Sequence, residues 1–289
     1  MTRVLYTPKR KKKILRGFSR FTHWFLMLFF CMIAFLAALF FLLRIPYLQI
    51  QRIEILGIET LDVQKIKEQV SDSLKGTYWF FVPKRFIFAA DAQKLSDELT
   101  SAFLKIRAAD IKKEFPGAIH ILISERNLFG IFCNDLAEAQ EADQKESDMP
   151  VQNKAVSQCG YLDEDGFVYG EAPEARGSLL TKVKSDAPLF KIGSQSVDAA
   201  TMGRMALVRQ ELHRITGIRV TSFELSSRLF SEMRLETAEG FKIFLKKDDD
   251  FVKRFQVLKK VLDDEIKENF RRLAYIDLRF GNKVFYKMK

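Results

Sequence analysis

The sequence predicts an α+β protein made of an N-terminal transmembrane helix, a small βααββ domain, and a second mixed or antiparallel β-sheet domain with flanking helices. Three observations predict this organisation. A long uncharged run lies near the N-terminus, residues 50–125 alternate strand and helix patterns in a βααββ order, and residues 126–289 are dominated by short strand patterns. Residues 44–49 are interpreted as a linker between the helix and the first domain.

The segment from Phe21 to Leu43 contains no Asp, Glu, Lys or Arg. A helix of this length rises about 34 Å, enough to cross a hydrocarbon core about 30 Å thick. A buried helix of a soluble domain seldom runs this long without a charged face. A cleaved signal peptide would have a shorter apolar core followed by a small-x-small site, whereas this run continues into Arg44-Ile45-Pro46. An uncleaved membrane anchor is therefore the favoured interpretation.

Eight Lys and Arg residues and no carboxylate lie in residues 1–20, which we interpret as a basic cytoplasmic tail. By the positive-inside rule they keep the N-terminus in the cytoplasm and place the domains after the span outside it. Most of the net charge of +10 belongs to this tail, so nucleic-acid binding is not favoured for the rest of the chain. The basic cluster is expected to contact lipid headgroups; it consists of Lys9, Arg10, Lys11, Lys12 and Lys13.

The first exported domain is predicted over residues 50–125. A strand over residues 50–56 ends at Gly57, a helix capped by Thr60 runs to Gly76, and a second helix begins near Asp91. Two strands follow, at 106–115 and 118–125, joined by Pro116-Gly117. An aromatic loop lies between the helices, and it either closes a small core or contacts a partner; it contains Tyr78, Trp79, Phe80, Phe81 and Pro83.

The second exported domain, over residues 126–289, contains a helical pattern at 199–216 and another that begins near Asp248, Asp249 and Asp250. Its expected strands lie at 128–133, 160–169, 220–225, 230–237, 241–245, 273–280 and 284–286. Residues 134–158 are acidic and rich in Ala and Gln, which predicts a flexible loop. Cys133 and Cys159 bracket this loop, and the sequence leaves open a disulfide between them or two unpaired buried thiols.

Nothing in the sequence assembles a catalytic or metal site. Only three His residues occur, and the motifs of zinc proteases, serine hydrolases and P-loop proteins are absent from the sequence. Asp163 and Asp165 suggest calcium, but the Glu that a twelve-residue binding loop requires is missing, so a turn is the better interpretation. We expect no enzyme activity, no cofactor, no metal and no small-molecule substrate.

Several motifs resemble the FtsQ/DivIB family of bacterial cell-division proteins. Residues 115–126 read FPGAIHILISER, which is similar to the family's W-P-x-x-(apolar, x, apolar, x)-E-R hairpin with Phe115 in place of Trp. Residues 161–168 read YLDEDGFV, like the family's apolar-x-D-x-x-G-x-apolar hairpin, and residues 275–280 read YIDLRF, like its late strand with Phe280 in place of Tyr. The resemblance implies a POTRA domain over residues 50–125 and an FtsQ/DivIB-type β domain over 126–289.

The resemblance also implies a scaffold at the division septum that binds the small coiled-coil division proteins FtsB (DivIC) and FtsL and helps recruit septal peptidoglycan synthesis. Arg279 and Phe280 match the family motif and are the contact residues that it implies. Because an exposed strand edge can accept a partner strand, Val284, Phe285 and Tyr286 are added on physical grounds, with packing on the late helix as the alternative for the two aromatic rings. Arg279 is expected to pair with an acidic partner segment. Two rival functions were considered. A POTRA-bearing transport component would need further POTRA repeats or barrel strands, and a membrane-tethered wall enzyme would need a catalytic group; the sequence shows none of these.

Overall fold

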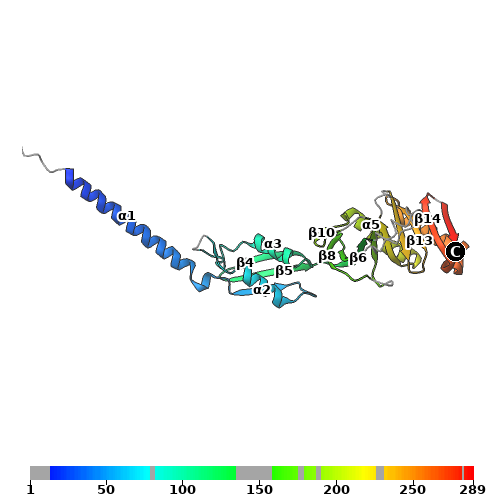
Figure 1. The fold of residues 1–289 in the computed structure, drawn as a ribbon, viewed down its shortest axis with the longest axis horizontal. Coiled ribbons are helices and arrows are strands. Elements are labelled where there is room, and N and C mark those ends of the chain that lie inside the picture. Colours follow the sequence, from blue (N-terminus) through cyan, green and yellow to red (C-terminus); the bar gives the residue numbers. More distant parts are fainter. Residues whose placement is uncertain are drawn as a thin grey trace, which may run out of the picture. The chain divides into compact units, whose positions relative to one another are not determined.

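The structure is a computed structural model, and it describes residues 14–78, 82–134, 158–174, 179–186, 190–225, 231–281 and 283–289 (Figure 1). The chain divides into two compact units. The first contains Met1–Ala102 and Ala108–Ser124, and the second contains Phe103–Arg107 and Glu125–Lys289. Both units combine helices and sheet, which confirms the predicted α+β class.

The N-terminal helix α1 spans Ile14–Leu43. Its part from His23 to Leu43 has the length and apolar composition of a membrane-spanning helix. The described side chains of this part are mostly exposed, as expected for a helix whose partner is lipid rather than protein. The predicted apolar helix is therefore confirmed.

The first unit has the predicted βααββ order, with a two-stranded hairpin added between the helices. Its elements are β1 (Arg52–Leu56), α2 (Val63–Ser73), β2 (Thr77–Tyr78), β3 (Val82–Pro83), α3 (Ala92–Ala102), β4 (Ile106–Glu114) and β5 (Ala118–Glu125). The main sheet has the order β1-β5-β4, and β1 pairs in parallel with β5. Its core is apolar and buried, and it includes Ile66, Val70, Leu95, Leu99, Ile106, Ile119, Ile121 and Ile123.

One local expectation in this unit was wrong, and the structure adds detail to another. Asp62, not Thr60, caps α2, because its carboxylate accepts the backbone N–H of Gln64 at 2.8 Å. The expected linker over residues 44–49 is also partly folded. Pro46–Leu48 forms the 3-10 turn η1, and Gln49 forms a β-bridge with Phe86, so backbone hydrogen bonds fix this segment to the domain.

The second unit contains one mixed sheet of ten strands in the order β10-β8-β7-β6-β9-β11-β12-β13-β14-β15. Its strands are β6 (Leu128–Asn134), β7 (Gln158–Asp163), β8 (Phe167–Glu171), β9 (Lys182–Ser185), β10 (Ser194–Gln195), β11 (Val220–Leu225), β12 (Glu232–Thr237), β13 (Lys242–Lys246), β14 (Leu273–Phe280) and β15 (Lys283–Met288). The sequence did not predict β9 and β10, which are short and carry too few apolar residues for a clear alternation.

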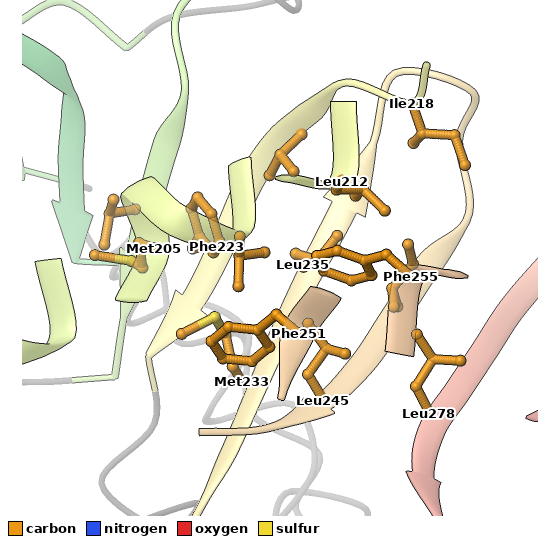
Figure 2. Close-up of a cluster of buried hydrophobic side chains, with 14 of the residues drawn as sticks. Met205, Leu212, Ile218, Phe223, Met233, Leu235, Leu245, Phe251, Phe255 and Leu278 are labelled. Carbon is orange, nitrogen blue, oxygen red and sulfur yellow. The ribbon is translucent and has the colours of Figure 1, made fainter. Parts of the chain in front are cut away.

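Two helices pack on one face of this sheet. They are α5 (Ala199–Thr216), capped by Asp198, and α6 (Phe251–Val261), capped by Asp250. A π-helical turn, η2 (Leu262–Ile266), and a 3-10 helix, η3 (Lys267–Arg272), connect α6 to β14. Figure 2 shows side chains of the two helices pointing into the same apolar cluster as alternate residues of the strands. Labelled members are Met205, Leu212, Ile218, Phe223, Met233, Leu235, Leu245, Phe251, Phe255 and Leu278.

Buried and partly exposed side chains alternate along the strands of this sheet. In the described part of the second unit, no helix covers the face opposite to α5 and α6. Phe223, Leu235 and Ile243 are fully buried, whereas their neighbours Glu224 and Arg234 are only partly buried. Because successive side chains of a strand point to opposite faces, the polar residues lie on the face away from α5 and α6.

Candidate functional site

The C-terminal strand β15 lies at the end of the ten-stranded sheet, where β14 is its only neighbour in the strand order. The two strands pair antiparallel, with Ile276 opposite Tyr286 and Asp277 opposite Phe285. One side of β15 therefore carries backbone groups that form no ladder with another named strand. Such an edge can accept an extended segment of a partner by strand addition.

A β-bulge determines which side chains share a face of this hairpin. Between Asp277 and Phe280 the register of β14 shifts by one residue, because the partners of these residues are Phe285 and Lys283. In a regular strand, residues three apart point to opposite faces. The extra residue brings Phe280 to the same face as Asp277 and Phe285.

The aromatic side chains of the hairpin are exposed, which favours the contact hypothesis over packing on α6. Phe280 is 55% exposed and Phe285 is 51% exposed. Their rings meet edge to face, with centroids 5.4 Å apart. Tyr286 is exposed too, and since it neighbours Phe285 in the strand it points to the other face of the sheet. The open edge is therefore flanked by aromatic rings on both faces.

Val284 is placed differently from its neighbours. It is half-buried and packs against the core cluster of the second unit. This position gives Val284 a packing role in the hairpin rather than an exposed contact surface, which departs from the expectation for this residue.

Arg279 is already ion-paired within the sheet. Its Nε donates to Oδ1 of Asp277 at 2.9 Å, its Nη2 to Oδ2 of Asp277 at 2.5 Å, and its Nη1 to Oε1 of Glu232 at 2.5 Å. The guanidinium also lies 5.4 Å from the ring centre of Phe244 and 5.6 Å from that of Phe280. Arg279 therefore links β12 to β14 through ion pairs within the sheet, and its charge is not free for an acidic partner.

The pKa values of this cluster follow from the same contacts. Burial alone would raise the pKa of Asp277, but the hydrogen bonds that it accepts from Arg279 outweigh burial and lower its pKa. Hydrogen bonds to Asp277 and Glu232 raise the pKa of Arg279 against the opposing effect of burial. Both groups are therefore held in their charged forms.

Sequence reasoning missed two further features of this surface. The register places Arg234, Phe244, Asp277 and Phe285 in one row across β12, β13, β14 and β15. Arg234 lies 5.4 Å from the ring centre of Phe244. Such a row depends on the strand order, which the sequence did not show.

The edge strand is also basic. Lys283 and Lys287 are exposed on β15, and Lys289 is exposed directly after it. The sequence could have indicated this, because residues 283–287 read K-V-F-Y-K and a strand places Lys283, Phe285 and Lys287 on one face. Lys residues on an edge strand oppose unspecific pairing and favour an acidic partner.

The other predicted site residues lie elsewhere. Cys133 and Cys159 face each other across β6 and β7 and are joined by a disulfide in the structure, with Cα atoms 4.2 Å apart. Asp163 has no calcium-like surroundings: Oδ1 accepts the N–H groups of Asp165 and Phe167, and Oδ2 pairs with Arg126 at 2.7 Å. Across the described residues no cluster of three or more His, Cys, Asp or Glu is suited to a metal ion.

Some predicted features fall outside the residues that the structure describes. These are the basic cluster at residues 9–13, Trp79, Phe80 and Phe81 of the aromatic loop, and most of the acidic segment over residues 134–158.

Comparison with known proteins identifies the first unit. Residues 48–126 match the model of the POTRA domain, FtsQ-type. No curated protein matches the chain. The matched range begins at the last residue of η1 and includes both helices and the three strands of the main sheet, in the order described above. This domain supports a role in cell division through protein–protein interactions. The FtsQ-type POTRA domain together with the N-terminal apolar helix α1 therefore fits a protein of the FtsQ/DivIB type.

Proposed function

We propose that this chain is a non-enzymatic division scaffold of the FtsQ/DivIB type that holds small coiled-coil division proteins, of the FtsB/DivIC and FtsL kind, at the edge strand β15. By binding them it helps recruit septal peptidoglycan synthesis. The observation that carries the proposal is the open end of the ten-stranded sheet, where unpaired backbone groups of β15 lie between exposed aromatic rings.

The chemistry of this edge specifies the partner segment. Backbone hydrogen bonds to β15 require an extended strand, and alternate side chains of that strand meet Phe280 and Phe285 on one face and Tyr286 on the other. Apolar side chains at alternate positions suit these rings. Acidic residues beside them suit Lys283 and Lys287, whereas Arg279 is already neutralised by Asp277 and Glu232.

The sidedness of the protein is part of the proposal. The eight cations of residues 1–20 precede a span without charges, and the positive-inside rule then keeps them in the cytoplasm. Both compact units lie outside the cytoplasmic membrane, and the protein acts at the septum. A reporter enzyme that is active only in the cytosol should be inactive when it is fused after Lys289. Activity of that fusion would contradict this orientation.

Capture of the partner by the full chain in detergent tests the binding edge. We expect Phe280→Ala and Phe285→Ala each to weaken capture of the extracytoplasmic segment of the FtsB/DivIC-like protein by about 10-fold or more, because each removes an exposed ring that would become buried at the interface. Leu207→Ala, which shortens an exposed apolar side chain on α5, is the matched control and should capture normally.

Amide hydrogen exchange separates strand addition from contact through side chains alone. With wild-type chain, adding the partner segment should slow exchange in the peptide that contains β15, since its outward N–H groups become hydrogen-bonded. Unchanged exchange in β15 together with unchanged capture by both Phe variants would refute the proposed binding mode.

A further inference from the structure

Three exposed aromatic rings form a cluster on the first unit that the binding edge does not use. Tyr47 is 63% exposed, Phe88 is 68% exposed and Phe115 is 62% exposed. The ring centre of Phe115 lies 6.3 Å from that of Tyr47 and 6.4 Å from that of Phe88. We call these three residues the aromatic cluster. Exposed apolar side chains that gather in this way commonly mark a contact surface.

The rings come from three segments that are fixed to one another. Tyr47 lies in η1, Phe88 lies after β3, and Phe115 directly follows the end of β4. The N–H of Ile87 donates to the carbonyl oxygen of Leu48 at 3.0 Å, and the N–H of Gln51 donates to that of Gly117 at 2.8 Å. The cluster is therefore a preformed surface of the domain and includes the residue Tyr47 that lies close to α1 in the sequence.

The short connection to α1 limits how far this surface can lie from a membrane. Leu43 ends the apolar helix, and Leu48 is already hydrogen-bonded to the domain. Five residues span at most about 18 Å when fully extended. The real span is shorter, because the N–H groups of Arg44 and Ile45 continue the helical turn and Pro46–Leu48 is a 3-10 helix.

The chemistry of the surface fits the boundary of a bilayer. Aromatic rings are enriched where headgroups meet the hydrocarbon core, and cations nearby can pair with lipid phosphates. Arg44, Arg52 and Arg85 are exposed on the segments that carry or adjoin the cluster. A lipid surface is also the one partner that is always within reach of a domain attached this closely to a membrane-spanning helix.

From these observations we infer that the aromatic cluster of Tyr47, Phe88 and Phe115 docks on the surface of the membrane that α1 crosses. The inference depends on α1 spanning the bilayer, but it depends neither on the binding edge at β15 nor on which side of the membrane the domain occupies. Docking would hold the FtsQ-type POTRA domain against the headgroups instead of leaving it free on its connection.

Tryptophan fluorescence in nanodiscs tests this inference. The sequence contains two Trp residues, so Trp24→Phe with Trp79→Phe gives a background to which Phe115→Trp adds a single reporter. The matched control is Leu122→Trp, since Leu122 is 54% exposed on the same unit. It lies four residues beyond Ala118 along β5, about 13 Å further along the strand.

The full-length chain is placed singly in nanodiscs of phosphatidylethanolamine and phosphatidylglycerol, with or without bromine on the lipid chains near the headgroups. We expect brominated lipid to quench the reporter at position 115 at least twofold more than the reporter at position 122. Adding Tyr47→Ser and Phe88→Ser to the Phe115→Trp chain should abolish the difference. These changes replace exposed rings, and circular dichroism verifies that the domain stays folded.

Equal quenching at positions 115 and 122 would overturn the inference. Because each disc holds one chain and no partner, a cluster that serves another protein or a second copy would also give equal quenching. Retention of every variant in the discs shows that α1 is inserted, and capture of the division partner by the same variants remains a separate readout of the edge at β15.

Discussion

Replacing Arg279 with Ala tests whether this residue supports the binding edge or contacts the partner directly. In the structure its guanidinium makes charge-assisted hydrogen bonds to Asp277 and Glu232, and the Asp277 side chain is only 8% exposed. Arg279→Ala would leave that carboxylate nearly buried without its cation. Breaking a fully buried pair costs about 3 to 5 kcal/mol.

The Arg279 side chain is 25% exposed, so water can partly replace it. We therefore expect Arg279→Ala to lower the free energy of unfolding of the second unit by about 2 to 3 kcal/mol. Arg279→Lys should cost less, because it keeps the charge but loses the two-pronged contact with Asp277.

Amide hydrogen exchange of the full chain in detergent measures this cost within the second unit alone. A loss of 2 to 3 kcal/mol raises the exchange rates of peptides from β13 and β14 about 30- to 150-fold. A double-mutant cycle with Asp277→Asn isolates the pair. Arg279→Ala could instead abolish partner capture while the free energy of unfolding, measured by exchange, changes by less than about 0.5 kcal/mol. That result would refute a role of Arg279 in supporting the edge and would make it a direct contact.

Three further predictions follow from the described contacts. Phe255→Ala empties a fully buried position under the sheet and should cost about 3 to 5 kcal/mol, measured by hydrogen exchange in α6; a cost near zero would contradict the packing in Figure 2. Intact mass without reductant should show Cys133 and Cys159 bridged, and Cys133→Ser with Cys159→Ser should cost about 3 kcal/mol; free thiols at both positions would contradict the bridge. The pKa of Asp277 is lowered in the folded state, so its stabilisation is complete above its ordinary pKa of about 4 and is lost as the pH falls through the lowered value. Exchange in β14 at pH 5 and pH 3 checks this, and greater protection of wild type at pH 3 than at pH 5, after correction for intrinsic rates, would show that the sign is wrong.

Local patterns accounted for much of the secondary structure. Helix α5 and strands β5, β11 and β14 begin and end where apolar periodicity and turn residues predicted. These elements bury one face against their own unit, so their sequence carries the period of that face. Prediction failed where a signal was short or where two nearby residues offered the same signal. Thr60 and Asp62 are both good capping residues, and the path of the backbone decides which of them caps α2.

The sequence likewise revealed only part of the proposed binding edge at β15. The motif around Arg279 and Phe280 and the aromatic residues of the last strand could be found in the sequence. Their roles could not, because the bulge that places Phe280 beside Phe285 depends on the pairing of β14 with β15, and the partners of Arg279 include Glu232, 47 residues away. The same holds for the aromatic cluster, whose rings come from three separate segments.

The sequence by itself determined the apolar helix, the βααββ order of the first domain and the types of residue available for binding, because length, periodicity and turn chemistry are properties of contiguous residues. Only the tertiary structure decided that β15 is the outer strand, that Arg279 is neutralised within the sheet, and that Tyr47, Phe88 and Phe115 meet. The physical reason is that strand order, register and ring contacts join residues far apart in the chain, and the free energy of those contacts depends on packing that no local pattern encodes.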